Sequence, residues 1–151
     1  MKREYLALVY GEVRHGGTVD EPIGRHPTQR VKMAVVEDGK PAVTHYQVEE
    51  KFPGCTLLRC RLETGRTHQI RVHLASLGHP LVGDNTYLKG PQKCPPQLRA
   101  ILSVFPRQAL HAERLGLEHP ATGEWLEWRV PLPGDMQQLL QQVRSVAHEI
   151  A

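Results

Sequence analysis

The sequence predicts a single α+β domain over residues 1–151, built on a mixed, mainly antiparallel sheet with two helices. Short runs of β-forming residues alternate with turn residues along most of the chain, and helical spacing replaces that pattern in two places. The chain has 151 residues, of which 40% are hydrophobic and 23% charged. This is the length and composition of one globular domain and excludes a disordered chain.

Two strands are expected at the start of the chain. Residues Tyr5–Val13 are mostly apolar or β-forming, Gly16-Gly17 marks a turn, and Thr18–Ile23 is the returning strand. The segment Gly24–Arg30 contains proline, glycine and three basic residues, which favours a loop.

A hairpin is expected next, because Asp38-Gly39 supplies the positive φ of a tight turn between Met33–Val36 and Val43–Val48. In the strand that follows, Leu58–Leu62, apolar and basic residues alternate. That period buries the apolar residues and turns the two arginines to the other face.

Helical spacing begins at Thr64–Gly78, where three apolar residues stand at i, i+4 and i+7: Ile70, Leu74 and Leu77. Thr64 or Thr67 can cap the first turn, and Gly78 can end the helix. We expect one amphipathic helix of about three turns in this segment, which carries Arg66 and Arg71.

The last third begins with an irregular segment, Gly78–Pro96, followed by two strands, Ala109–Leu117 and Trp125–Val130. Trp125 and Trp128 fall on opposite faces of the second strand, so both cannot belong to one core layer. A C-terminal helix is predicted by a stripe of apolar residues at helical spacing: Met136, Leu139, Leu140, Val143, Val146 and Ile150.

Positive charge is concentrated locally, although the net charge is only +3. Between Arg59 and His79 the basic side chains are opposed by Glu63 alone. A second basic stretch contains Arg25, His26, Arg30 and Lys32. Local basic stretches favour a nucleic-acid partner more than the overall charge does.

The chain has no candidate membrane helix, because its longest apolar run, Tyr5–Tyr10, is far shorter than the roughly 20 residues needed. No signal-peptide pattern follows Met1. The three cysteines do not form a disulfide framework. We therefore expect a cytoplasmic protein with reduced thiols and no membrane partner.

The densest group of chemically versatile residues is Leu62–His73, where a strand end and a glycine turn lead into a helix. A helix start presents free backbone N–H groups, which suit a phosphate or carboxylate. Arg71 lies about a quarter turn from the apolar stripe and can border a cleft. Gln69 and the imidazoles can hydrogen-bond bases or ribose. The alternative, a solvated basic helix with no function, has about equal weight.

Other chemistries have less support. His68 and His73 are five residues apart, which places them on different faces of a helix, and no zinc-binding cysteine pair is present. No Gly-x-Ser-x-Gly, Walker or dinucleotide-binding motif occurs. We expect no metal and no cofactor.

Leu62–His73, together with Gly78–Asp84, resembles the arginine-containing motif of the pseudouridine synthases, in the branch that acts on large-subunit ribosomal RNA. Lys2–Gly11 resembles the tyrosine motif of that family. Three further segments resemble one member of the branch in particular: Gly17–Ile23, Gly39–Tyr46 and Arg107–Ala112. The likeness runs from Arg3 to Ile150 and implies a partial pseudouridine synthase catalytic fold.

The resemblance implies a reaction without cofactor or metal, in which the C1′–N1 bond of a flipped-out uridine is cut and the uracil is rejoined through C5. In this family an aspartate attacks the nucleotide, a tyrosine stacks on it or deprotonates it, and a basic residue pairs with the aspartate. By matching motif, Tyr5 is the expected tyrosine and Arg71 the expected basic residue. The residues expected to contact RNA are Gly65, Arg66, Thr67, His68, Gln69, His73, Arg25, Arg30 and Lys32.

The sequence departs from the family pattern at the aspartate, which in the family lies in a His-Arg-Leu-Asp segment ahead of the tyrosine motif. None of Asp20, Asp38, Asp84 and Asp135 has that context. Asp84 is the one to test as a substitute, and we expect it to be structural. The chain thus resembles the C-terminal portion of a catalytic domain, and we expect the aspartate motif and the N-terminal RNA-binding module to lie outside it.

These features lead to two main hypotheses. In the first, the parent activity is isomerisation of specific uridines in large-subunit ribosomal RNA, and this chain contributes the tyrosine and arginine but is inactive alone. In the second, the chain is a catalytically dead fragment that binds RNA or a protein partner. An unrelated metal-dependent enzyme is a third, weaker hypothesis. Without the first strands of the family fold, self-association through an open sheet edge is also expected.

Overall fold

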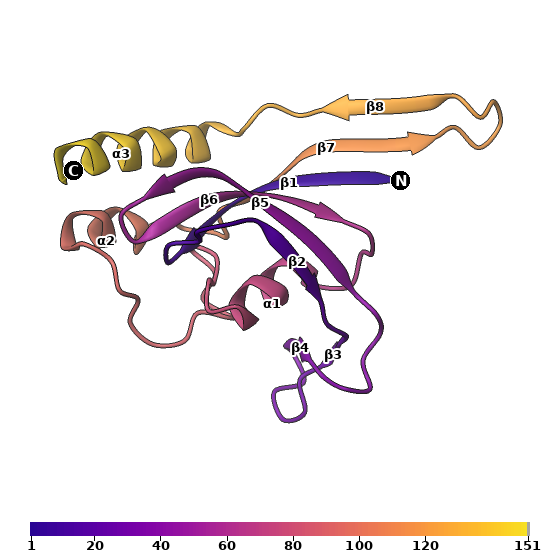
Figure 1. Cartoon of the computed structure of the whole chain (residues 1–151), viewed down its shortest axis with the longest axis horizontal. Coiled ribbons are helices and arrows are strands. Elements are labelled where there is room, and N and C mark those ends of the chain that lie inside the picture. Colours follow the sequence, from indigo (N-terminus) through magenta and orange to yellow (C-terminus); the bar gives the residue numbers. More distant parts are fainter. Residues whose placement is uncertain (151) are drawn as a thin grey trace.

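The computed structural model describes residues 1–150, which form a six-stranded sheet, a two-stranded sheet and three helices (Figure 1). The strands are β1 (Lys2–Tyr10), β2 (Gly17–Asp20), β3 (Ile23–Arg25), β4 (Met33–Val35), β5 (Val43–Phe52), β6 (Cys55–Leu62), β7 (Leu110–Glu118) and β8 (Trp125–Arg129). The helices are α1 (Gln69–Ser76), α2 (Pro96–Leu102) and α3 (Gly134–Ile150). The large sheet has the order β2-β5-β6-β1-β7-β8 with antiparallel neighbours, which confirms the predicted α+β class.

Alternation along β1 divides the sheet into two buried faces. Leu6 and Leu8 pack in a cluster with apolar residues of α2 and α3. Ala7 and Val9 point the other way, into a cluster with Leu74 and other residues of α1. Because successive side chains of a strand point to opposite faces, odd-numbered β1 residues share the α1 face.

The helix α1 lies between the large sheet and the small sheet of β3 and β4. Ile70 packs on the large sheet, whereas Val72 packs in a separate cluster with Ile23 and Tyr87. Met33 of β4 packs against that second cluster. The small sheet is therefore fixed to the side of α1 that faces away from the large sheet. In Figure 1, β3 and β4 lie below α1 and the large sheet lies above it.

The predicted hairpin between Met33–Val36 and Val43–Val48 is wrong. β4 pairs with β3, with Ile23 opposite Val35, and β5 pairs with β2 and β6. Pro41 has no N–H to donate to a ladder, so the chain cannot continue as one paired strand from Gly39 into β5. Pro22 similarly lies at the break that divides the expected strand Thr18–Ile23 into β2 and β3.

The helix α1 begins later than predicted, at Gln69, and no side chain caps it. The Thr64 hydroxyl instead accepts a hydrogen bond from Val43 N at 2.9 Å, which ties this turn to β5. The end is as expected: Gly78 has φ 87°, its N–H bonds to Ala75 O, and the N–H of the next residue bonds to Leu74 O. Such a left-handed glycine stop is a common helix terminus.

The C-terminal third confirms two strands and the last helix and adds one helix that was not expected. α2 begins with a proline at its first position and buries Leu98 and Leu102, which are spaced i and i+4. Pro at the first helical position is a known start signal, so the sequence did contain a cue to this helix.

The β7–β8 hairpin extends beyond the rest of the sheet (Figure 1), and β8 is an edge strand. Trp125 is 50% and Trp128 is 48% exposed, so neither is core. Trp128 lies opposite Leu115, which is also exposed. None of the helices in residues 1–150 combines the length and the apolar composition that a membrane span requires.

Candidate active site

Arg71 of α1 is held by a two-point ion pair with Asp84. Its Nε donates to Oδ2 at 2.8 Å and its Nη2 donates to Oδ1 at 3.0 Å. The Asp84 side chain is fully buried and that of Arg71 is 14% exposed. The hydrogen bonds that Arg71 donates to Asp84 raise the pKa of its guanidinium despite its partial burial. The cation is thus fixed in one orientation, with Nη1 outside this ion pair.

The turn that presents Asp84 depends on the glycine before it. Gly83 has φ 79°, and a Cβ there would lie 1.8 Å from Arg107 O. Only glycine fits both requirements. Within the turn, Thr86 N donates to Asp84 Oδ1 at 3.2 Å.

Tyr87 contacts Arg71 in addition to Asp84. The Arg71 guanidinium lies 5.0 Å from the centre of the Tyr87 ring, a cation–π distance. The Tyr87 hydroxyl accepts from Met33 N at 3.0 Å and lies 2.7 Å from His68 Nδ1. One ring therefore links α1, β4 and the residue that precedes the helix.

His68 is the only residue other than glycine with a positive φ, 55°, among residues 1–150. Burial and the neighbouring Arg71 cation lower the pKa of the His68 imidazole. This conformation costs free energy in a residue with a Cβ, so the contact with Tyr87 helps to maintain it.

Tyr5 lies on the α1 face of β1, where it is half-buried and packs against the cluster that contains Cys60 and Ile70. Arg3, two residues earlier, shares that face, and its guanidinium lies over Gly65. A Cβ on Gly65 would come within 2.9 Å of three guanidinium atoms. No ion pair of Arg3 is found within residues 1–150. Sequence reasoning missed Arg3, although its period-two spacing from Tyr5 was a usable signal.

The two predicted basic stretches meet beside the small sheet. A hollow of about 420 Å³ is lined by Arg25 of one stretch and by Gly65, Arg66 and Thr67 of the other, with Asp38 and Lys40 beside them. Arg66 Nε donates to Pro41 O at 2.8 Å, and Arg25 Nη1 donates to Arg30 O at 3.0 Å. Lys32 lines a different cavity, which lies between β4 and α1.

Gln69 and His73 do not lie on this surface. Gln69 is 3% exposed, and its amide bonds to Val43 O at 3.0 Å and accepts from Arg66 N at 3.0 Å. His73 is fully buried between Thr44, 2.8 Å from Nδ1, and Glu21 O, 2.9 Å from Nε2. The polar groups of both side chains are occupied within the protein, so neither side chain is free to contact RNA in this structure, contrary to the expectation from sequence.

Within the described residues, no three His, Cys, Asp or Glu side chains gather as a metal site would require. Cys55, Cys60 and Cys94 are buried and unpaired. Burial raises the pKa of the Cys55 and Cys60 thiols to about 12, so neither is a reactive thiolate at neutral pH.

Comparison with known proteins assigns the family. The RNA pseudouridylate synthase family model matches residues 1–76, a range that includes Tyr5 and Arg71. Ribosomal large subunit pseudouridine synthase D of Nitrosomonas europaea is 57% identical over 148 residues, which is 98% of this chain and 42% of the relative. The protein of the same name from Escherichia coli K12 is 53% identical over 146 residues, 95% of this chain and 45% of the relative. The chain therefore spans less than half the length of these relatives.

Two solved human structures have the same fold. Human RNA Pseudouridylate Synthase Domain Containing 4 superimposes with a TM-score of 0.74 at 28% identity, covering 95% of this chain and 62% of that one. Domain Containing 1 gives a TM-score of 0.69 at 29% identity, covering 95% and 66%. Because the family model spans half of the chain and the fold agrees over nearly all of it, this chain belongs to the RNA pseudouridylate synthase family.

Proposed function

We propose that the protein isomerises specific uridines of large-subunit ribosomal RNA to pseudouridine. The observation that carries the proposal is the fixed Arg71 cation, held by Asp84 and Tyr87 within the family's arginine motif. The names of the relatives from N. europaea and E. coli support the choice of large-subunit ribosomal RNA.

In the proposed reaction an attacking carboxylate displaces N1 from C1′ and forms a C1′–O bond. The uracil turns, and C5 then displaces the carboxylate to form the C1′–C5 bond. N1 gains a proton and C5 loses one, so the reaction is an isomerisation. Arg71 keeps the attacking carboxylate ionised, because a cation at contact distance favours the charged form. Nη1 is the edge of Arg71 that faces this carboxylate, since Nε and Nη2 bind Asp84.

Tyr5 stacks on the uracil or removes its proton. Its half-buried position on the α1 face of the sheet supports this role. Arg3, beside it on the same face, binds a phosphate next to the target nucleotide. Arg25, Arg66 and the backbone of Gly65–Thr67 bind phosphates farther along the RNA. Because these contacts neutralise phosphates, binding falls with salt.

Asp84 is a positioning residue in this proposal and not the attacking group. Both of its oxygens bind Arg71 and its side chain is fully buried, which leaves no path for a nucleotide carbon. We therefore propose that the attacking aspartate comes from outside this sequence and that residues 1–151 alone have no turnover.

The test compares two proteins on a large-subunit ribosomal RNA transcript. One is the 151-residue chain, and the other is extended upstream through a His-Arg-Leu-Asp segment. Pseudouridine formation by the extended protein alone supports the proposal. Product from the short chain places the nucleophile within it, and Asp84→Asn then tests the remaining candidate. If neither protein gives product but both bind the RNA, the alternative of a catalytically dead RNA-binding fragment replaces the proposal.

A further inference from the structure

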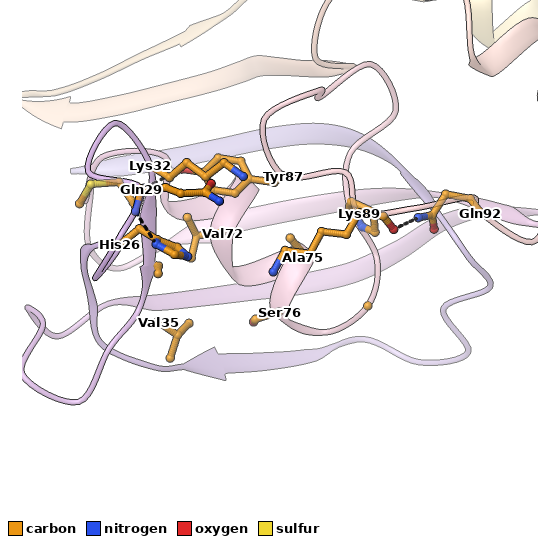
Figure 2. A pocket seen from close by; sticks show the side chains of 14 residues that line it. His26, Gln29, Lys32, Val35, Val72, Ala75, Ser76, Tyr87, Lys89 and Gln92 are labelled. Carbon is orange, nitrogen blue, oxygen red and sulfur yellow. Dashed lines mark hydrogen bonds between the residues drawn. The ribbon is translucent and has the colours of Figure 1, made fainter.

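A second cavity lies on the side of α1 that faces away from the large sheet (Figure 2). Its volume is about 420 Å³, within the range of about 300–1,000 Å³ typical of small-molecule sites. The floor is formed by Val72 and Ala75 of α1, with Met33 and Val35 of β4 beside them. Figure 2 shows His26, Gln29 and Lys32 on one side and Lys89 and Gln92 on the other.

The lining combines an apolar floor with polar donors, two of which carry positive charge. Lys32 and Lys89 supply two ammonium groups, and Gln29 and Gln92 supply two amides. None of the described residues that line the cavity is Asp or Glu. An apolar floor suits the face of a nucleobase, side-chain amides suit its polar edge, and lysines suit a phosphate.

The cavity shares one wall with the proposed active site. Tyr87 lines it and is also the ring on which the Arg71 guanidinium rests, at 5.0 Å. The Tyr87 hydroxyl accepts a hydrogen bond from Met33 N, which ties the ring to β4. A group bound in the cavity therefore lies one side chain away from the Arg71 cation.

We propose that this cavity binds an unpaired nucleotide of the RNA other than the target uridine, with its base on Val72 and Ala75 and its phosphate at Lys89 or Lys32. The identity of the ligand as RNA rests on the proposed function. The cavity then selects targets whose neighbourhood can release a second base, a requirement on RNA shape rather than on the target uridine itself.

The first test needs no activity and uses the 151-residue chain with uridine and adenosine 5′-monophosphates as probes. Saturable changes in the amide NMR signals of residues 72–76 and 87–92 are expected. Ala75→Leu fills the floor of the cavity and should remove these changes. Saturable changes confined to the hollow around Arg25 and Arg66, or no changes at all, overturn the proposal.

A second variant, which changes charge and not volume, tests the proposal even if Ala75→Leu does not fold. Lys89→Gln removes one ammonium group from the lining, and Lys93→Gln, four residues away and outside the lining, is its matched control. With a single-stranded segment of large-subunit ribosomal RNA, Lys89→Gln should make the log–log salt slope shallower by about 0.7, the value for one phosphate. Equal slopes for the two variants overturn the proposal.

The extended protein separates this inference from the proposed function. Ala75→Leu and Lys89→Gln should raise KM for the RNA and leave kcat unchanged, since neither residue touches the reacting uridine. If the extended wild-type protein makes no pseudouridine while the NMR changes occur, the proposed function fails and the nucleotide site stands. If the extended wild-type protein makes pseudouridine and both variants keep its KM, the proposed nucleotide site is refuted and the proposed function stands.

Discussion

Asp84 binds Arg71 through both carboxylate oxygens, across 13 positions of sequence, and only the arginine retains any exposure. The pair joins α1 to the turn after Gly83, so it serves the architecture as well as the proposed chemistry. Removing one partner has a different consequence from removing both charges, because a single charge then remains buried without a counter-ion.

Arg71→Ala should therefore unfold more easily than the native chain, by about 3–5 kcal/mol, the usual cost of leaving one member of a buried pair. Arg71→Gln combined with Asp84→Asn keeps hydrogen-bonding groups without either charge and should cost much less. Urea denaturation of the native chain and both variants measures the difference. Equal losses in the two variants would show that the ion pair has no special role in stability.

Stability should decline as the pH falls below 6.5, because His73 is buried in its neutral form. Burial lowers the pKa of His73 below its ordinary value of 6.5. A neutral ring donates from Nε2 to Glu21 O and accepts at Nδ1 from the Thr44 hydroxyl, whereas protonation of Nδ1 removes that acceptor.

The sign follows from proton binding. Below pH 6.5 the unfolded chain binds a proton that the folded chain does not bind, so the free energy of unfolding falls as the pH falls. The contribution is complete above pH 6.5 and is lost progressively down to the folded pKa. Urea midpoints of the native chain and His73→Gln between pH 5 and 7.5 test this. His68, whose pKa is also lowered, contributes with the same sign, so His68→Gln is the comparison. A difference between native and His73→Gln that does not change with pH contradicts the prediction.

RNA affinity should depend steeply on salt and should weaken when Arg25 is neutralised. Arg25 and Arg66 line one hollow, so Arg25→Gln removes one phosphate contact and should reduce the log–log slope by about 0.7–0.9. Lys51→Gln removes the same charge from an exposed position on β5 and is the control. Fluorescence anisotropy at several salt concentrations gives the slopes of both variants. Identical slopes would show that Arg25 does not contact a phosphate of the RNA.

The chain should self-associate through the exposed face of the β7–β8 hairpin. Leu115 and Trp128 form an exposed cross-strand pair on edge strand β8 and its neighbour, and exposed apolar edge strands favour pairing with another copy. Sedimentation velocity should show a concentration-dependent oligomer that Trp128→Lys abolishes. Trp125→Lys, on the opposite face, should have a smaller effect. A monomer at all concentrations would contradict this expectation.

The predictions that succeeded from sequence rest on local periodicity. Alternation in Leu58–Leu62 predicted which side chains are buried: Leu58 and Cys60 are fully buried, and Leu62 is partly buried. The stripe from Met136 to Ile150 predicted α3, and Gly78 predicted the end of α1. Each signal lies within a few residues, because side-chain direction repeats every two residues in a strand and every 3.6 in a helix.

The hairpin prediction failed because the pairing partners of a strand can be distant in sequence. Asp38-Gly39 suggested a local hairpin, but β4 pairs with β3 and β5 with β6. Gln69 and His73 were expected at the RNA surface because their side chains are polar. The structure instead uses them inside the protein to connect α1 with β5 and with Glu21.

The sequence by itself determined the α+β class, the strand faces, the terminal helix and the motif that contains Arg71. Only the tertiary structure decided that Asp84 and Tyr87 surround Arg71, that Arg3 lies over Gly65, and that the small sheet encloses a cavity against α1. The physical reason is that periodicity assigns a side chain to a face, whereas the packing of segments far apart in the chain chooses which charges and rings meet there.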